Sequence, residues 1–189
     1  MLSGKNAIIT GAGRGIGRAI AEAFAAQGCK VAVLARTQEE IDETIAAIKA
    51  QGGDGVALVC DVSKVDSVSE VFQSAEEALG PIDILVNNAG VACFKPFMEL
   101  SLDDWETSLR VNLTSTFVCS QAVIPGMIKR GGGKIINISS VSGLKAITDQ
   151  SAYCAAKHGV NGLTKALALE LQPHGIGVHA ICPGGVVTR

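Results

Sequence analysis

The stretch "NAIITGAGRGIG", from Asn6 to Gly17, decides the fold. Its apolar start favours a short buried strand, and an amphipathic helical pattern begins near Arg14. Glycines occupy every second position between Gly11 and Gly17, and glycine allows both a sharp turn and a close approach of the backbone to a ligand. The stretch therefore predicts a strand, a tight turn and a helix in immediate succession.

The same alternation of short apolar runs and longer amphipathic runs continues along the chain, which is typical of a parallel sheet built from β-α units. The predicted strands are Asn6–Thr10, Lys30–Ala35, Gly55–Cys60, Ile82–Asn87, Lys134–Ser139 and Gly177–Cys182. The predicted helices begin near Arg14, Thr37, Lys64, Leu102 and Ser151. No repeat, low-complexity segment or linker interrupts them, so we predict an α/β fold with one doubly wound, Rossmann-type domain over residues 1–189.

Composition excludes several classes of protein. Of the 189 residues, 48% are hydrophobic, which is enough for a sizeable core. The 16 basic and 18 acidic residues nearly balance and form no basic run, so nucleic acid is not an expected partner. Apolar runs end well before the ~18 residues that a membrane span needs, and the amino terminus has no signal-peptide pattern. We expect a cytoplasmic protein with no membrane partner.

Six cysteines are scattered singly along the chain, without a CxxC pair or a cluster of cysteine and histidine. This spacing indicates neither a metal site nor a disulfide framework. Most of these cysteines lie within apolar strand or helix patterns, so we expect buried free thiols.

Small and polar residues follow five of the predicted strands, where packing alone does not require them. The segments are "TGAGRGIG" after the first strand, "DVS" after the third, "NNAG" after the fourth, "SSVSG" after the fifth and "PGG" after the sixth. In doubly wound sheets, ligands bind beyond the carboxyl ends of the strands, near the point where the strand order reverses. We therefore expect the functional site at this edge of the sheet.

The glycine-rich turn predicts a dinucleotide site. A helix that follows such a turn offers free backbone amides and the positive end of its dipole to a pyrophosphate. The spacing, T-G-x-x-x-G-x-G, differs from the G-x-G-x-x-G fingerprint, and no Gly-Lys-Ser or Gly-Lys-Thr follows, which excludes a P-loop. A purely structural turn is the alternative for the glycines alone.

Two arginines favour NADP over NAD as the dinucleotide. About 20 residues after the glycines, NAD-binding proteins carry an acidic residue that holds the ribose hydroxyls. Here Arg36 stands in that neighbourhood, the first carboxylate is Glu39, and Arg14 lies within the glycine-rich turn. Guanidinium groups match a 2′-phosphate in charge and geometry. Either arginine alone could equally be a solvated surface charge.

Tyr153, the only tyrosine of the chain, begins the segment "YCAAK", which ends at Lys157. Residues four apart share one face of a helix, so the phenol and the ammonium could point into one site. Ser140, in "NISSVSG", precedes the tyrosine by thirteen positions. A phenol has an ordinary pKa near 10, and lowering it by about three units takes ~4 kcal/mol of phenolate stabilisation. We expect Lys157 to supply it.

The ordered motifs "TGAGRGIG", "NNAG", Asn112 in "RVNL", Ser140 in "NISSVSG", "YCAAK" and "PGGVVT" resemble the short-chain dehydrogenase/reductase family over essentially the whole chain. The resemblance implies that Tyr153 is the general acid and base, and that Ser140 positions the substrate carbonyl. It implies that Lys157 stabilises the phenolate and binds the nicotinamide ribose, and that Asn112 holds a water linking Lys157 to solvent. Ser139 competes with Ser140, and Asn112 could instead mark a kink in its helix.

The resemblance further implies a cofactor site along the carboxyl edge of the sheet. Asp61 would bind the adenine edge, Val62 would add a backbone contact, and Pro183 would begin a wrap around the nicotinamide. For "NNAG", a plain turn is the alternative. The implied cofactor-binding residues are Gly11, Arg14, Gly15, Ile16, Gly17, Arg36, Asp61, Val62, Asn88, Ala89, Gly90, Tyr153, Lys157, Pro183, Gly184, Val186 and Thr188.

The family resemblance implies an oxidoreductase that interconverts a ketone and a secondary alcohol with NADP(H), as a homotetramer or homodimer. The chain is most similar to 3-oxoacyl-acyl-carrier-protein reductases, with sugar or polyol dehydrogenases as the alternative and a nucleotide-binding module without turnover as a competing class. The resemblance also implies that about a quarter of the enzyme, with a substrate loop and a seventh strand, follows Arg189. Phe94, Phe97 and Met98 could line the substrate cleft or simply pack a loop.

Overall fold

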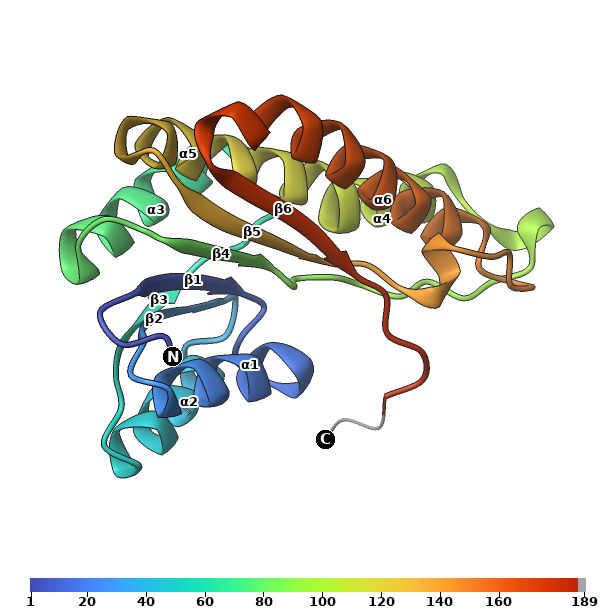
Figure 1. Ribbon diagram of the computed structural model, residues 1–189. Helices are drawn as coiled ribbons and strands as arrows, with labels where there is room; N and C mark the ends of the chain where they lie inside the picture. The colour runs from blue at the N-terminus through green and yellow to red at the C-terminus, as the bar shows by residue number, and fades with distance from the viewer. Residues whose placement is uncertain (187–189) are drawn as a thin grey trace.

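The computed structural model of the protein describes residues 1–186 and shows a six-stranded sheet with helices on both faces (Figure 1). The strands are β1 (Asn6–Thr10), β2 (Lys30–Ala35), β3 (Asp54–Val59), β4 (Ile84–Asn87), β5 (Gly133–Ile138) and β6 (Ile176–Ile181). Their order is β3-β2-β1-β4-β5-β6, and every neighbouring pair is parallel. The predicted α/β, doubly wound fold with six strands is confirmed.

The helices of the described residues alternate with the strands. They are α1 (Gly15–Ala26), α2 (Gln38–Ala50), α3 (Val65–Leu79), α4 (Leu102–Leu109), α5 (Ser115–Arg130) and α6 (Ser151–Leu171). A π-helical turn, Arg110–Thr114, joins α4 to α5, and short 3₁₀ helices lie at Phe97–Glu99, Val141–Gly143 and Gln172–His174. The helix predicted to begin at Leu102 is therefore one continuous run with an irregular turn in its middle.

Strand boundaries match the sequence prediction at β1 and β2 and shift elsewhere. β3, β5 and β6 each begin and end one residue earlier than predicted. β4 begins at Ile84 instead of Ile82. The backbone N–H of Asp83 donates to the Asn6 carbonyl oxygen, and the Asp83 carboxylate accepts from the Asn6 backbone N–H, so the ladder with β1 starts only at the pair Ala7↔Ile84. Ile82 is still buried in the core.

Each face of the sheet carries its own apolar core, because helices cover both faces (Figure 1). Alternate residues of β1 show the division: Ala7 and Ile9 pack with α1 and α2, whereas Ile8 packs with α3, α5 and α6. Strands buried on both faces read as continuous apolar runs. This burial explains why the strands could be located from the sequence.

The strand order reverses at β1 and β4, which neighbour each other in the sheet although the chain visits β2 and β3 between them. Loops that follow two such strands diverge and leave a crevice at their carboxyl ends. The loops after β1 and β4 are the glycine-rich turn and "NNAG". The fold thus brings the two most unusual segments of the sequence to one crevice.

The run Leu102–Arg130 is the one helical stretch of the described residues with the length and composition of a membrane span, because an 18-residue window within it has a mean hydropathy of 1.2. Polar residues interrupt it, so no long apolar run marks it in the sequence. Its buried side chains include Asn112, Ser115, Thr116 and Ser120, and α5 packs against β4 and β5. Core helices of globular domains share this length and composition, and we assign Leu102–Arg130 to the core.

All six cysteines are free thiols. Cys29, Cys60 and Cys119 are buried, and the other three are half-buried, so the expectation of buried thiols holds for half of them. Within residues 1–186, no group of three or more histidine, cysteine, aspartate or glutamate side chains could hold a metal ion.

Candidate active site

The glycine-rich turn packs directly against the segment that follows β4. Gly11 has a φ of 64°, which favours glycine. A Cβ atom at Gly11 would lie 2.8 Å from the Cα of Ala89, and one at Gly17 would lie 2.3 Å from the Gly11 carbonyl oxygen. Neither position leaves room for a side chain. The packing of the turn on the loop after β4 therefore requires both glycines. Gly11, Gly13 and Gly15 of the same turn line a cavity, and we call them the glycine cradle.

Two polar side chains hold this turn to the "NNAG" segment. The Thr10 hydroxyl accepts hydrogen bonds from the backbone N–H groups of Asn88 and Ala89, at 3.0 and 3.1 Å. The Asn88 amide donates to the carbonyl oxygens of Thr10 and Gly11, at 2.9 and 3.0 Å. "NNAG" is therefore more than a plain turn, because Asn88 clamps two segments that lie far apart in the sequence.

A cavity of about 610 Å³ lies over these segments, within the ~300–1,000 Å³ typical of ligand sites. Most of the predicted cofactor residues line it: Gly11, Arg14, Gly15, Ile16, Arg36, Asp61, Val62, Asn88, Ala89, Gly90, Gly184 and Val186. Gly17 lies beneath the turn and is buried. Thr188 lies outside the described residues. The volume and the glycine cradle fit a dinucleotide.

Charged side chains border one end of this cavity. Arg36 is exposed beside it, while the Arg14 guanidinium lies 3.6 Å from a carboxylate oxygen of Glu40, which also lines the cavity. Thr44, on α2, is fully buried, and its hydroxyl lies within hydrogen-bond distance of three carbonyl oxygens, those of Glu40 at 3.0 Å and of Ala12 and Gly13 at 3.2 Å. The sequence analysis missed Glu40 and Thr44, because only the packing of α2 on the turn brings them there.

Asp61, at the end of β3, is held in its charged form. Burial alone would raise the pKa of its carboxyl, but hydrogen bonds from Ser63 and the charges of Arg36 and Lys64 outweigh burial and lower it. One carboxylate oxygen accepts both the backbone N–H and the hydroxyl of Ser63, at 3.1 and 2.7 Å. Asp61 therefore presents a fixed negative charge to the cavity.

A second cavity, of about 240 Å³, adjoins the first and brings Ser140, Tyr153 and Lys157 together. Ser139 and Pro183 also line it, and Ile16, Asn88, Gly90, Val91 and Gly184 line both cavities. Ser140, from the loop after β5, thus meets Tyr153 and Lys157, both from α6, in one place beside the dinucleotide cavity. We call this second space the catalytic cavity.

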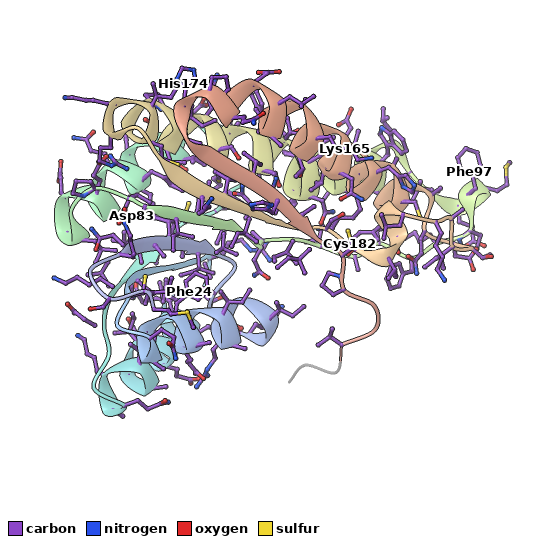
Figure 2. The ribbon with its side chains drawn as sticks, in the orientation of Figure 1. Phe24, Asp83, Phe97, Lys165, His174 and Cys182 are labelled. Atoms are coloured by element: carbon purple, nitrogen blue, oxygen red, sulfur yellow. The ribbon has the colours of Figure 1, made fainter. Side chains whose placement is uncertain are left out.

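Lys157 is a buried ammonium, with only 4% of its surface exposed. Its Nζ donates to the Ile138 carbonyl oxygen at 2.8 Å and lies 5.6 Å from the centre of the Tyr153 ring. Burial lowers the pKa of Lys157 to about 8, and nearby Cys182 acts weakly in the opposite direction. Cys182 lies at the carboxyl end of β6 (Figure 2). The lysine is thus in the predicted place but is a weaker base than an exposed lysine.

Burial raises the pKa of Tyr153 above 10, although the neighbouring Ser140 hydroxyl opposes this effect. The sequence analysis expected Lys157 to lower this pKa. The expected lowering also included the positive charge of a bound nicotinamide; in the chain by itself, burial outweighs any lowering. The two groups share a site, in which burial disfavours the charged form of each.

The adjacent serines point to different partners. The Ser139 hydroxyl donates to the Lys157 carbonyl oxygen at 3.2 Å, which joins β5 to α6. The Ser140 hydroxyl accepts from the backbone N–H of Ser142 at 3.1 Å and lies beside the Tyr153 hydroxyl. The geometry therefore favours Ser140 over Ser139 as the partner of the phenol.

Asn112 lies in the π-helical turn and lines neither cavity. Its side chain accepts from the Val91 N–H at 3.2 Å and donates to the carbonyl oxygens of Val91 and Ser108, both at 2.9 Å. A Cβ atom at Gly90 would lie 2.9 Å from the Asn112 oxygen and 3.7 Å from the Lys157 Nζ. Asn112 therefore fixes the loop after β4, close to the lysine, and it also marks the helix irregularity.

A buried polar chain under the sheet was not anticipated from the sequence. The Asn87 amide donates to Ser120 on α5 and to Asn137 on β5, at 3.1 and 2.9 Å, and Asn137 donates to Thr164 on α6 at 2.9 Å. These side chains tie the catalytic helix α6 to the sheet. The only sequence signal of these buried hydrogen bonds is the presence of asparagines within apolar strand patterns.

Known proteins resemble this chain over nearly its whole length. A family model described as short chain dehydrogenase matches residues 5–189. The 3-oxoacyl-[acyl-carrier-protein] reductase of Synechocystis sp. is 40% identical over 188 residues, which are 99% of this chain and 76% of that protein. The D-threitol dehydrogenase of Mycolicibacterium smegmatis is 41% identical over 188 residues, which are 100% of this chain and 72% of that protein.

Solved structures give the same result. A variant of actinorhodin polyketide ketoreductase, crystallised with NADPH, superposes with a TM-score of 0.95 and 38% sequence identity. The match covers 97% of this chain and 71% of that chain. The match extends over nearly the whole chain, and the matched proteins are longer than this chain.

Proposed function

Because the chain belongs to the short chain dehydrogenase family, whose members are oxidoreductases acting on CH–OH groups, we propose that it transfers a hydride between NADP(H) and a ketone or secondary alcohol. The observation that carries the proposal is the catalytic cavity, which brings Ser140, Tyr153 and Lys157 together beside the dinucleotide cavity. Tyr153 is the general acid and base of the proposed reaction.

The hydroxyls of Ser140 and Tyr153 donate hydrogen bonds to the carbonyl oxygen, and Tyr153 then gives that oxygen its proton. A nicotinamide dinucleotide bound in the adjoining cavity would supply the hydride to the carbonyl carbon, and its oxidised form would add positive charge beside the phenol. Since the pKa of Tyr153 is raised by burial, the phenol keeps its proton at neutral pH. This protonation state suits the reduction of a ketone.

Lys157 supports the same step through its charge. Its pKa of about 8 lies above neutral pH, so most molecules carry an ammonium there. This charge stabilises the phenolate that forms when Tyr153 gives up its proton. The hydrogen bond to Ile138 fixes the Nζ position, and Asn112, through Val91, fixes the neighbouring loop.

We propose NADP rather than NAD as the cofactor. Arg36 and Arg14 border the cavity end that is lined by Asp61 and Val62, and no ion pair of Arg36 is found among the described residues. Charge-assisted hydrogen bonds to a phosphate contribute ~1.5–3 kcal/mol, so Arg36→Ala should weaken NADPH binding about tenfold or more. NADH binding should change less than about threefold, and Arg18→Ala, an arginine outside the cavity, serves as the control. Equal losses for both cofactors would contradict the proposal.

For the substrate, we propose a 3-oxoacyl thioester, with a sugar or polyol as the alternative. The relatives support both, since one is a 3-oxoacyl-[acyl-carrier-protein] reductase and another a D-threitol dehydrogenase. NADPH oxidation with acetoacetyl thioester, compared with a panel of ketoses, separates the two.

The adjacent serines provide the test of the proposed reaction itself. Ser140→Ala removes the hydroxyl beside the phenol and should lower kcat by ~100-fold or more. Ser139→Ala loses a hydrogen bond to the Lys157 backbone, and its fold decrease in kcat should be at least ~10 times smaller than that of Ser140→Ala. Loss of NADPH oxidation of the same size in both variants, or in neither, would refute the assignment of Ser140.

We also propose that the protein is a cytoplasmic homo-oligomer, a tetramer or a dimer. Large apolar side chains are exposed on α4, α5 and α6, namely Leu102, Phe117, Ile128 and Leu169. Exposed apolar side chains on neighbouring helices favour packing against a second copy. Light scattering of the wild type and of Phe117→Glu tests the oligomer, and a monomeric wild type would contradict it.

A further inference from the structure

The side-chain donors that line the catalytic cavity are nearly all committed to the chain itself. The Asn88 amide donates both of its protons to Thr10 and Gly11, and the Ser139 hydroxyl donates to Lys157. Lys157 already donates one proton to Ile138. Two protons of the Lys157 ammonium remain, and the family resemblance assigns Lys157 to the nicotinamide ribose. With Lys157 assigned in this way, the hydroxyls of Ser140 and Tyr153 are the side-chain donors left for a substrate among the described residues that line the cavity, and one carbonyl oxygen uses both.

The rest of this lining is small and apolar. Val91, Ala92, Ile138 and Pro183 contribute no polar side chain, and Lys157 is the only charged residue of the lining within residues 1–186. A substrate hydroxyl buried without a hydrogen-bond partner costs ~1–3 kcal/mol. Several hydroxyls on one substrate would therefore be rejected, whereas alkyl or aryl groups would be accepted.

Phe94 adds an apolar surface next to the phenol. Its ring packs edge-on against Tyr153, with the centres 6.0 Å apart and the planes at 84°. The ring does not line the catalytic cavity, and 59% of the Phe94 surface is exposed. A substituent that leaves the carbonyl and passes the Tyr153 ring would meet this exposed aromatic face.

The residues on both sides of Phe94 are anchored. The Cys93 sulfur lies 3.7 Å from an Asp104 carboxylate oxygen, and the Lys95 ammonium lies 2.7 Å from the other. The Lys95 backbone N–H also donates to the Asp149 carbonyl oxygen at 2.9 Å. An exposed side chain between two fixed neighbours is held in place for contact, which lowers the entropy cost of binding against it.

We propose that the catalytic cavity takes ketones whose substituents are apolar, and that Phe94 is the residue that selects for longer apolar substituents. The inference rests on the reductase activity proposed for the chain. It places thioesters with alkyl chains and simple ketones above sugars and polyols as the substrate class. Phe94 acts on substrate choice and takes no part in the proton transfer.

The test compares methyl propyl ketone with xylulose, which has the same number of carbon atoms but several hydroxyls. With NADPH, kcat/KM should be about 100-fold higher for the ketone, the size of discrimination expected from a few unpaired polar groups. A preference for xylulose would overturn the inference while leaving the reductase activity intact. Reduction of neither compound and of no acetoacetyl thioester, with NADPH still bound, would refute the proposed reaction itself and the inference with it.

The role of Phe94 is tested with methyl hexyl and methyl propyl ketone. In Phe94→Ala, the ratio of kcat/KM for the longer over the shorter ketone should fall about tenfold, since the lost contact serves only the longer chain. Phe97→Ala is the matched control, because Phe97 is 71% exposed and projects from the far tip of the molecule (Figure 2). Equal losses for both ketones in Phe94→Ala, or the same fall in Phe97→Ala, would overturn the role.

Discussion

Burial shifts the pKa values of Tyr153 and Lys157 in opposite directions. Burial raises the pKa of the phenol and lowers the pKa of the ammonium to about 8, because a buried site disfavours both charged forms. At neutral pH the pair is therefore a protonated phenol beside a mostly charged lysine. Such a pair can give a proton to a carbonyl oxygen and then stabilise the phenolate that is left.

The single tyrosine makes this arrangement measurable. Phenolate absorbance at alkaline pH, read in a rapid pH jump before the chain unfolds, should show a midpoint above 10 for the folded protein. In urea the midpoint should return to about 10, the value of an exposed tyrosine. Ser140→Ala should raise the folded midpoint further, because the Ser140 hydroxyl lowers it. A folded midpoint at or below 10 would show that the lysine charge outweighs burial.

Helix α1 begins at a turn where only glycine fits. This requirement can be tested by comparing Gly17 with a glycine in another helix. A Cβ atom at Gly17 would lie 2.3 Å from the Gly11 carbonyl oxygen and 2.4 Å from the Asn88 amide nitrogen. Gly162, on α6, is also helical but has no atom within 4 Å of such a Cβ. The two glycines differ in surroundings and share a conformation.

Gly17→Ala should lower the free energy of unfolding by ~1–3 kcal/mol through overpacking, and it should weaken NADPH binding. Gly162→Ala should raise the free energy of unfolding by ~0.5–1 kcal/mol, because alanine costs less backbone entropy in a helix. Urea unfolding of both variants checks the pair. A Gly17→Ala protein as stable as the wild type would contradict the close packing of the turn on Asn88.

Elements buried on both faces could be predicted from the sequence, and elements fixed by distant contacts could not. β1 and β2 read as continuous apolar runs because helices cover both sides of the sheet. The π-helical turn at Arg110–Thr114 accompanies hydrogen bonds between Asn112 and Val91, which lie twenty-one positions apart. Local periodicity contains no signal for such a contact, although an asparagine within a helical pattern did mark the place.

At the scale of the whole molecule, the site was predictable where its residues follow strands or, like Tyr153 and Lys157, form a motif on one helix face, and it was unpredictable where only helix packing delivers a residue. Asp61, Asn88 and Ser140 stand at the ends of strands, and the sheet gathers them at one edge. Glu40 reaches the cavity from α2, and Thr44, on the same helix, holds the backbone of the glycine-rich turn; only the packing of that helix decides their place. The fold topology can be inferred from the hydrophobic pattern of the sequence, but which helix side chains lie at the cavity can be seen only in the structure.

The buried lysine should also leave a mark on the stability of the molecule. A lysine with a pKa of about 8 when folded and 10.5 when unfolded destabilises the folded state fully below pH 8. Between pH 8 and 10.5 the folded lysine is neutral while the unfolded lysine keeps its proton, so the free energy of unfolding rises with pH. The cost has disappeared above pH 10.5, where the lysine is neutral in both states. The buried thiols oppose the trend: burial raises the pKa of Cys29 and Cys60 to about 11, so their contribution falls above about pH 9.

Comparison with Lys157→Met removes the thiol contribution, since both proteins share it. The free energy of unfolding of the wild type, minus that of the variant, should rise by ~1 kcal/mol between pH 8 and 9. Urea unfolding at pH 7, 8 and 9 measures this difference. A difference that stays constant over this range would show that Lys157 keeps an ordinary pKa and is not desolvated as the structure indicates.

The most direct test of Tyr153 as general acid and base is Tyr153→Phe, which removes one oxygen atom and keeps the ring that packs against Phe94. Steady-state NADPH oxidation with methyl propyl ketone and NADPH binding by fluorescence are measured on the same preparation. The variant should lose ~100- to 10,000-fold in kcat, the range expected for a lost proton donor. Its NADPH affinity should stay within about threefold of the wild type, because the glycine cradle and the arginines are untouched. Turnover within tenfold of the wild type, with NADPH bound normally, would contradict the central role of the phenol.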